Sequence, residues 1–387
     1  MKRITQLLLL LPLLWAAGCQ KEAPRQENEG TEKRDEAVVK IHASLANPAN
    51  ATKAIIHGTD IPDGFTYGIF VCKAGTTDTH HKANSWNVRA SFTAGTEGEE
   101  GRWSYQYINP ATNILAPTQY DNITITAPLV GAPEADLYAY APYITKADGN
   151  NPQKNIAFDP TAIPFAISQE IRKQDDLMYA EENATDANKG LNPLSESNEP
   201  LKANFTFKHA LALLAFEFEI KNYSSSYSSS YRLKSITVKK KNPRANTTAQ
   251  IYRSGTFNAI TGNINYDDCT SVDSLKVSQL TPGGESPIIT PNKLPAADHI
   301  AYMALVPTEL EDDELEVHFV FNETDQITAK PFVIKKQYVK HGDEETYGFQ
   351  GGYKYTFRFT MDNYLNLKDF DIESWDATII PIEPVEI

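Results

Sequence analysis

Two stretches decide the fold class: Phe205–Ile220, which reads FTFKHALALLAFEFEI, and Gly351–Phe359, which reads GGYKYTFRF. Aromatic residues take every second place in the body of the later stretch, with lysine, threonine and arginine between them. This period of two predicts a β-strand with one buried face and one solvent-exposed face. The earlier stretch is also strand-like, but its apolar positions change parity halfway along. Because a slip of one residue turns a strand inside out, we expect a β-bulge near Leu213–Ala215.

Short strand-like segments separated by Gly, Pro, Asn and Asp recur along the whole chain, which predicts a mostly-β protein. A short helical periodicity is visible only at Met361–Leu367. The expected strands cover residues 37–45, 65–72, 102–107, 123–127, 137–143, 176–180, 205–220, 231–240, 247–257, 299–306, 315–321, 330–340, 353–360 and 378–382.

The length of 387 residues suggests two domains, at about 100–200 residues per domain. Glu181–Asn204 is polar and contains glycine and prolines, so we place the domain boundary there. The predicted architecture is two β-sandwich domains in tandem, covering residues 37–195 and 196–387.

The N-terminus, MKRITQLLLLLPLLWAAGCQKE, has the three parts of a signal peptide: two basic residues, a short apolar run and a small-residue cleavage site. The Ala-Ala-Gly-Cys ending resembles a bacterial lipobox, although Ala16 stands where leucine is commoner. The resemblance implies removal of residues 1–18 and lipid chains, palmitate among them, on Cys19. The alternative is an ordinary secretory leader with an incidental cysteine. Residues 19–36 have almost nothing to bury and predict a disordered tether.

The chain is acidic, with a net charge of −14 that becomes −16 when Lys2 and Arg3 leave with the leader. Such a chain has no electrostatic reason to bind nucleic acid. Cys72 and Cys269 lie far apart in sequence, in different predicted domains, so no disulfide framework is indicated.

No catalytic or cofactor-binding motif is found in the sequence, which predicts a non-enzymatic protein without a cofactor or metal. His80 and His81 lie in a polar loop without spaced partners. The acidic run Glu309–Glu316 lacks the spacing of a calcium loop, so we interpret it as a charged turn before a strand. Gly351 and Gly352 are interpreted as a turn, because no helix follows them.

Several segments follow one another in a specific order: the leader, the first strand, LYAYAPY at 137–143, DLMYA at 176–180, the two stretches quoted first and IESWDATI at 372–379. In the order and spacing of these segments the chain resembles the fimbrillin family, the pilins of type V fimbriae. The resemblance covers residues 37–387. It implies two transthyretin-like β-sandwich domains and export as an outer-membrane lipoprotein. It also implies a proteolytic cut after the first strand, and replacement of that strand by one donated from another subunit.

Mapped onto this chain, the removable strand is Ala37–Leu45 and the scissile bond joins Lys53 to Ala54. The family usually has arginine there, and an arginine-specific protease would cut poorly after Lys53. A cut at Arg34 would release the anchor but leave the first strand in place. An anchor subunit that keeps its lipid and first strand therefore remains an alternative to a stalk pilin.

The donor strand is expected at the C-terminus, with apolar side chains Ile379, Ile380, Ile382, Val385 and Ile387. The same segment is equally compatible with the last strand of the second sandwich, in which case the protein is a tip or accessory subunit. The expected function is a structural and adhesive subunit of a cell-surface fimbrium, with other subunits, the outer membrane and a host or bacterial surface ligand as partners. The alternative is a monomeric surface lipoprotein that binds a glycan or host ligand.

Overall fold

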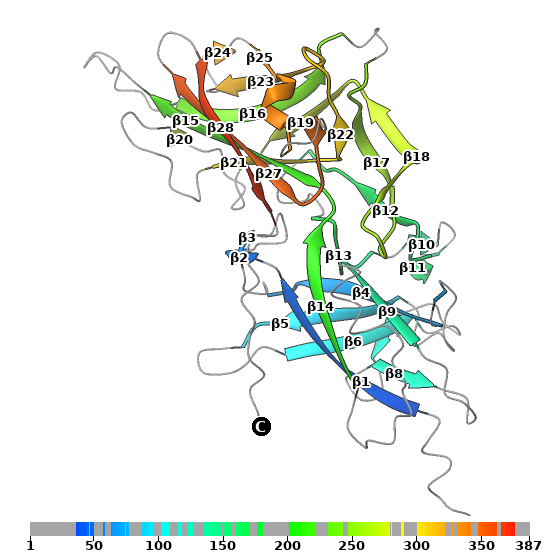
Figure 1. Cartoon of the computed structure of the whole chain (residues 1–387). Helices are drawn as coiled ribbons and strands as arrows, with labels where there is room; N and C mark the ends of the chain where they lie inside the picture. The colour runs from blue at the N-terminus through cyan, green and yellow to red at the C-terminus, as the bar shows by residue number, and fades with distance from the viewer. Residues whose placement is uncertain are drawn as a thin grey trace, which may run out of the picture.

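The protein is described by a computed structural model (Figure 1). The described residues are 36–45, 47–49, 57–58, 63–73, 75–76, 87–95, 102–108, 115–117, 123–126, 135–144, 146–148, 151–156, 159–169, 176–180, 201–220, 231–242, 247–278, 280, 288–289, 300–321, 327–328, 331–341, 347–361 and 365–375. Within these ranges the chain is almost entirely strand, which confirms the mostly-β prediction. They contain no helix with the length and apolar character needed to cross a lipid bilayer.

A nine-stranded sheet forms the lower body in Figure 1. In spatial order its strands are β7 (Leu115–Pro117), β6 (Arg102–Ile108), β5 (Val88–Thr93), β4 (Thr66–Lys73), β9 (Ala135–Ala141), β13 (Met178–Ala180), β14 (Leu201–His209), β1 (Glu36–Leu45) and β8 (Ile123–Thr126). Two small hairpins accompany it, β2 (Asn47–Ala49) with β3 (His57–Gly58) and β10 (Lys146–Asp148) with β11 (Asn151–Ile156).

The upper body is built on two larger sheets. One has the order β21 (Ala301–Leu305), β15 (Ala212–Ile220), β27 (Tyr353–Met361) and β28 (Leu365–Ser374). The other contains β19 (Ser274–Ser278), β16 (Tyr231–Lys240), β23 (Leu315–Phe321) and β24 (Ile327–Thr328), joined by β20 (Ile288–Ile289) and β25 (Phe332–Val333). A three-stranded sheet of β12 (Ile163–Ala166), β17 (Ile251–Phe257) and β18 (Ile264–Val272), the pair β22 (Thr308–Glu309) with β26 (Gly348–Phe349), and the 3-10 helix η6 (Lys336–Val339) complete it.

Aromatic side chains fill the space between the two larger sheets of the upper body. Phe216 of β15 meets Phe319 of β23 edge to face, with ring centroids 5.4 Å apart. Phe218 makes the same kind of contact with Phe321 at 5.6 Å. Edge-to-face aromatic pairs add to the free energy of area burial, so these contacts fix how the sheets face each other. They also explain the alternating aromatic residues of the sequence.

The bulge expected near Leu213–Ala215 is wrong. Phe205–Ile220 forms two strands, β14 and β15, and β14 begins earlier, at Leu201. The chain leaves the nine-stranded sheet after His209 and enters the four-stranded sheet at Ala212. The apolar parity changes because the residues on either side of Ala210 and Leu211 belong to different cores. In Figure 1 β14 rises from the lower body toward the upper one.

Of three further expectations in the last part of the chain, two need correction and one falls outside the described residues. The helical periodicity at Met361–Leu367 is not a helix, because Leu365–Ser374 is strand β28. The strand expected at 330–340 is reduced to β25, and the chain then forms η6. The strand expected at 378–382 lies outside the described residues.

Strand pairing crosses the predicted domain boundary at 195/196 in both directions. β12 precedes the boundary but pairs with β17 of the upper body. β14 follows the boundary but pairs with β13 and β1 of the lower body. Each body therefore contains a strand from the other side of the predicted boundary. The boundaries 37–195 and 196–387, and the transthyretin-like character of the two domains, stay predictions.

Candidate functional site

Strand β1 is an inner strand of the nine-stranded sheet. It pairs in parallel with β14, from Val39 opposite Leu201 to Leu45 opposite Phe207. On its other side it pairs antiparallel with β8, from Glu36 opposite Thr126 to Val39 opposite Ile123. Removing β1 would leave backbone N–H and C=O groups of two strands without their partners. This position makes β1 the candidate assembly site.

β14, the parallel neighbour of β1, is anchored by its side chains. Phe205 and Phe207 are fully buried, and both contact the buried ring of Tyr67 on β4. The centroid of Phe207 lies 5.3 Å from that of Tyr67 and 6.2 Å from that of Phe65. Because these contacts involve β4 and its flank rather than β1, they would hold β14 in place if β1 left the sheet.

The far end of β14 is fixed to the upper body. Its last residue, His209, is buried, and its Nδ1 lies 2.7 Å from Oδ1 of the buried Asp176, just before β13. The imidazole also stacks on the indole of Trp375, the residue that follows β28. β14 thus pairs with β1 along most of its length and contacts, through its last residue, the end of the four-stranded sheet.

The connection between β14 and β15 rests on a glycine turn. The Gly352 N–H donates to the Leu211 carbonyl at 3.0 Å. A Cβ added at Gly351 would lie 2.5 Å from the carbonyl oxygen of Ala210, so a side chain at this position would collide with the backbone. The predicted turn at Gly351–Gly352 is confirmed. The close approach of the Ala210 carbonyl explains why position 351 is a glycine, the residue without a Cβ.

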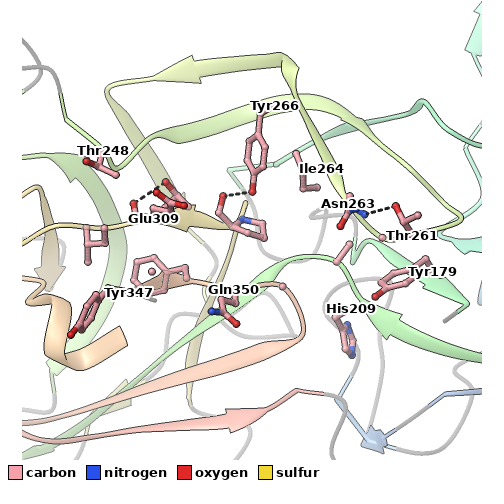
Figure 2. A pocket seen from close by; sticks show the side chains of 18 of the residues that line it. Tyr179, His209, Thr248, Thr261, Asn263, Ile264, Tyr266, Glu309, Tyr347 and Gln350 are labelled. Atoms are coloured by element: carbon pink, nitrogen blue, oxygen red, sulfur yellow. Dashed lines mark hydrogen bonds between the residues drawn. The ribbon is translucent and has the colours of Figure 1, made fainter. Parts of the chain in front are cut away.

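A cavity of ≈ 780 Å³ lies at the junction of the two bodies (Figure 2). Tyr179 and His209 line it from the nine-stranded sheet, and the hairpin between β17 and β18 lines it from the upper body. The full lining is Tyr179, His209, Ala210, Thr248, Thr261, Gly262, Asn263, Ile264, Tyr266, Pro307, Thr308, Glu309, Leu310, Glu311, Tyr347, Gly348, Phe349, Gln350 and Gly351. Tyr266 donates a hydrogen bond to the Pro307 carbonyl at 3.1 Å.

Tyr266 is the exposed aromatic of this cavity. Partial burial, together with the neighbouring Tyr252, Cys269 and Glu309, raises the pKa of its hydroxyl to about 12. The phenol is therefore neutral at physiological pH and can donate a hydrogen bond. Sequence analysis did not single out this residue. The sequence feature that could have indicated it is a single aromatic residue in Ile264–Val272 (β18), a strand that is otherwise mostly polar.

The middle of the acidic run Glu309–Glu316 is a charged turn before β23, as predicted, whereas Glu309 belongs to β22 and Glu316 to β23. The Glu314 carboxylate accepts hydrogen bonds from the N–H groups of Thr248, Ala249 and Glu311. Glu311 forms an ion pair with Lys336. Among the residues that the structure describes, no group of three or more His, Cys, Asp or Glu side chains is arranged to hold a metal ion.

The sequence-predicted processing and donor residues are not brought together by the described part of the chain. The lipidation candidate, the scissile pair and the donor-strand candidates lie outside the described residues: Cys19, Lys53, Ala54, Ile379, Ile380, Ile382, Val385 and Ile387. The roles given to them stay predictions.

Comparison with known proteins matches residues 52–375 of this chain to a family model described as fimbrillin-like. No curated protein matches the chain. A solved protein from Bacteroides ovatus ATCC 8483, assigned to cell adhesion, shares 16% identity at a TM-score of 0.49, covering 89% of this chain and 98% of that one. A fimbrial protein from Bacteroides vulgatus ATCC 8482 shares 14% at a TM-score of 0.47, covering 88% and 99%. The tip fimbrial protein Mfa3 from Porphyromonas gingivalis, solved with a C-terminal truncation, shares 8% at 0.43, covering 88% and 100%.

Proposed function

Since this chain belongs to the fimbrillin-like family, we propose that it is a non-enzymatic structural and adhesive subunit of a type V fimbrium that assembles by donor-strand exchange. The observation that carries the proposal is the position of β1. It is an inner strand paired on both sides, beside a β14 that is anchored independently. We further propose that the precursor is exported as a lipoprotein and held at the outer membrane by lipid on Cys19.

The exchange begins with a cut between Lys53 and Ala54. β1 is then no longer covalently joined to the rest of the chain and can leave the sheet. Its departure exposes the edge of β14 over Leu201–Phe207, where the backbone groups that β1 had paired need new partners. A strand from another subunit restores those hydrogen bonds, with alternate side chains entering the space left by β1. The C-terminal segment with Ile379, Ile380, Ile382, Val385 and Ile387 is the proposed donor.

Lysine at position 53 suits a protease of trypsin-like specificity that accepts lysine. The test is limited trypsin digestion of the purified chain, followed by N-terminal sequencing and a gel of the products. We expect a new N-terminus at Ala54 and concentration-dependent ladders of polymer. Lys53→Ala should block both results, whereas Lys53→Arg should preserve them.

Arg34→Ala is the matched control, because a cut at Arg34 lies before β1 and leaves that strand in place. The Arg34→Ala chain should still be cut at Lys53 and still polymerise. A chain that is cut after Lys53 and remains monomeric would contradict the stalk role. Such a chain would be a tip or anchor subunit, or a stand-alone surface lipoprotein that binds a ligand.

A further inference from the structure

We propose that the cavity at the junction of the two bodies binds a neutral carbohydrate, with the ring of Tyr266 as the stacking surface and the side-chain amides of Asn263 and Gln350 as hydrogen-bonding groups. The proposal gives the adhesive part of the proposed function a ligand class and rests on that part alone. It does not require strand exchange.

Tyr266 is exposed yet held in place. Its side chain is 47% exposed, and among the described residues only Phe370, at 40%, is another large hydrophobic side chain with such exposure. The hydroxyl is tied to the Pro307 carbonyl, and the ring lies 5.5 Å from that of Tyr252. A ring fixed at both its tip and one side loses little conformational entropy when a ligand stacks on it. Such a surface suits the apolar face of a sugar ring.

The wall opposite Tyr266 carries polar groups (Figure 2). Figure 2 shows Gln350 and Tyr347 across the cavity from Tyr266, with Asn263 and Thr261 at one end. Within the described part of the chain, the side-chain amides of Asn263 and Gln350 have no protein hydrogen-bond partner, although the backbone N–H of each is engaged. An amide both donates and accepts, which matches the hydroxyl groups of a sugar.

The charges around the cavity favour a neutral ligand. The described residues that line it include no lysine or arginine. The ammonium of Lys336, 4.7 Å from the centroid of the lining Tyr347 ring, is already paired with Glu311, so the lining offers an anionic ligand no unpaired basic partner. Of the acidic and imidazole side chains in the lining, His209 is hydrogen-bonded to Asp176 and Glu311 is paired with Lys336. Glu309 is left as the one carboxylate there without an ion pair among the described residues. It can accept hydrogen bonds from sugar hydroxyls.

The test is binding of neutral oligosaccharides to the purified full chain, measured by glycan array and by titration calorimetry. The panel carries hexose, N-acetylhexosamine and deoxyhexose termini, with sialylated and sulfated counterparts and a lysine-rich peptide for comparison. We expect binding of at least one neutral oligosaccharide at millimolar or lower concentration. Its sialylated and sulfated forms, and the peptide, should not bind.

Variants locate the binding in the cavity. Tyr266→Ala should weaken it roughly tenfold, as expected for the loss of one aromatic stacking contact. Gln350→Ala should weaken it as well, whereas Tyr266→Phe, which keeps the ring, should retain most of it. Phe370→Ala is the matched control, because it removes the other exposed aromatic, outside the cavity, and should leave the affinity unchanged.

Failure to bind any neutral oligosaccharide would overturn the proposal. So would a preference for the charged glycans or the peptide, or equal affinity in the Tyr266→Ala and Phe370→Ala chains. Circular dichroism and thermal melting of each variant exclude misfolding as the cause of a loss. Because polymerisation is scored separately on a gel, a failure of carbohydrate binding and a failure of strand exchange are distinguishable.

Discussion

The imidazole of His209 stacks on the indole of Trp375 with ring centroids 3.7 Å apart and planes only 2° from parallel. His209 ends β14 of the nine-stranded sheet, whereas Trp375 follows β28 of the four-stranded sheet. Oδ1 of Asp176 lies 2.7 Å from Nδ1 of the imidazole, and the backbone N–H of Trp375 donates to the Gly352 carbonyl at 2.7 Å. This stack therefore joins the two bodies at the end of β14, the strand that pairs with β1.

Replacing Trp375 with alanine should remove the stacking contact with His209 and so destabilise the fold. Trp375 is 5% exposed, and truncation of a buried tryptophan costs about 3 kcal/mol of unfolding free energy or more. Urea denaturation monitored by circular dichroism measures the loss. Phe370→Ala, on β28 and 40% exposed, is the control and should cost about 1 kcal/mol. Equal losses in the two variants would show that the stack contributes nothing particular to stability.

Gly262 should resist substitution more strongly than another glycine of the same backbone conformation. Gly262 has φ +75°, and a Cβ there would lie 2.1 Å from Cε1 of Tyr179. Gly64 has φ +76°, but a Cβ there would meet nothing within 4 Å. We expect Gly64→Ala to cost about 1 kcal/mol from backbone strain alone, and Gly262→Ala about 3 kcal/mol once the clash is added.

Thermal and urea unfolding of the two glycine variants measure the difference. Since Tyr179 and Gly262 both line the junction cavity, Gly262→Ala should also alter the cavity, whereas Gly64→Ala should not. Identical costs for the two variants would mean that Tyr179 moves aside without loss of packing.

Glu314 should contribute more to stability than its acidic neighbour Glu311. The Glu314 carboxylate accepts three backbone N–H groups, at 2.6 Å from Thr248 and 2.9 Å from both Ala249 and Glu311. Glu314→Ala leaves these donors unpaired and should cost about 1–3 kcal/mol. Glu311→Ala breaks only a surface ion pair with Lys336 and should cost less than about 1 kcal/mol. Denaturant midpoints of both variants test the order, which a larger loss for Glu311→Ala would reverse.

Stability should fall below neutral pH partly through His341. Burial lowers the pKa of His341 from its ordinary value of 6.5, and its Nε2 lies 2.5 Å from the Tyr355 hydroxyl. The unfolded chain therefore binds a proton at a higher pH than the folded chain does. The stabilisation is complete above pH 6.5 and is lost as the pH falls through the lower folded pKa.

Melting temperatures of the wild-type chain and His341→Gln, measured from about pH 8 to about pH 5, isolate this contribution. The wild type should lose more stability than His341→Gln over that interval. Parallel curves would contradict a depressed pKa at this position.

Local patterns were enough to predict the strands in which apolar residues alternate clearly. The alternation in Tyr353–Phe359 predicted a strand with a buried aromatic face, and Tyr355, Phe357 and Phe359 are buried in β27. Strands 231–240 and 315–321 were predicted with the bounds that β16 and β23 have. The side-chain period of a half-buried strand is a property of neighbouring residues, so it can be read without knowing the strand's partners. The same patterns, with the leader and the motif order, indicated the fimbrillin family.

The tertiary structure decided which sheet each strand joins. The stretch Phe205–Ile220 was interpreted as one bulged strand because a parity change looks the same whether the strand bulges or passes to a second sheet. The parallel pairing of β1 with β14, and that of β15 with β27, joins residues far apart in the chain. The junction cavity likewise depends on such long-range contacts, because its walls come from β13, β14, β18 and the turn at Gly351. The sequence by itself determined the strands with clear alternation, such as β16, β23 and β27, because the side-chain period is a local property. Only the tertiary structure placed β1 beside an anchored β14 and Tyr266 across from Gln350, because both depend on how distant segments pack.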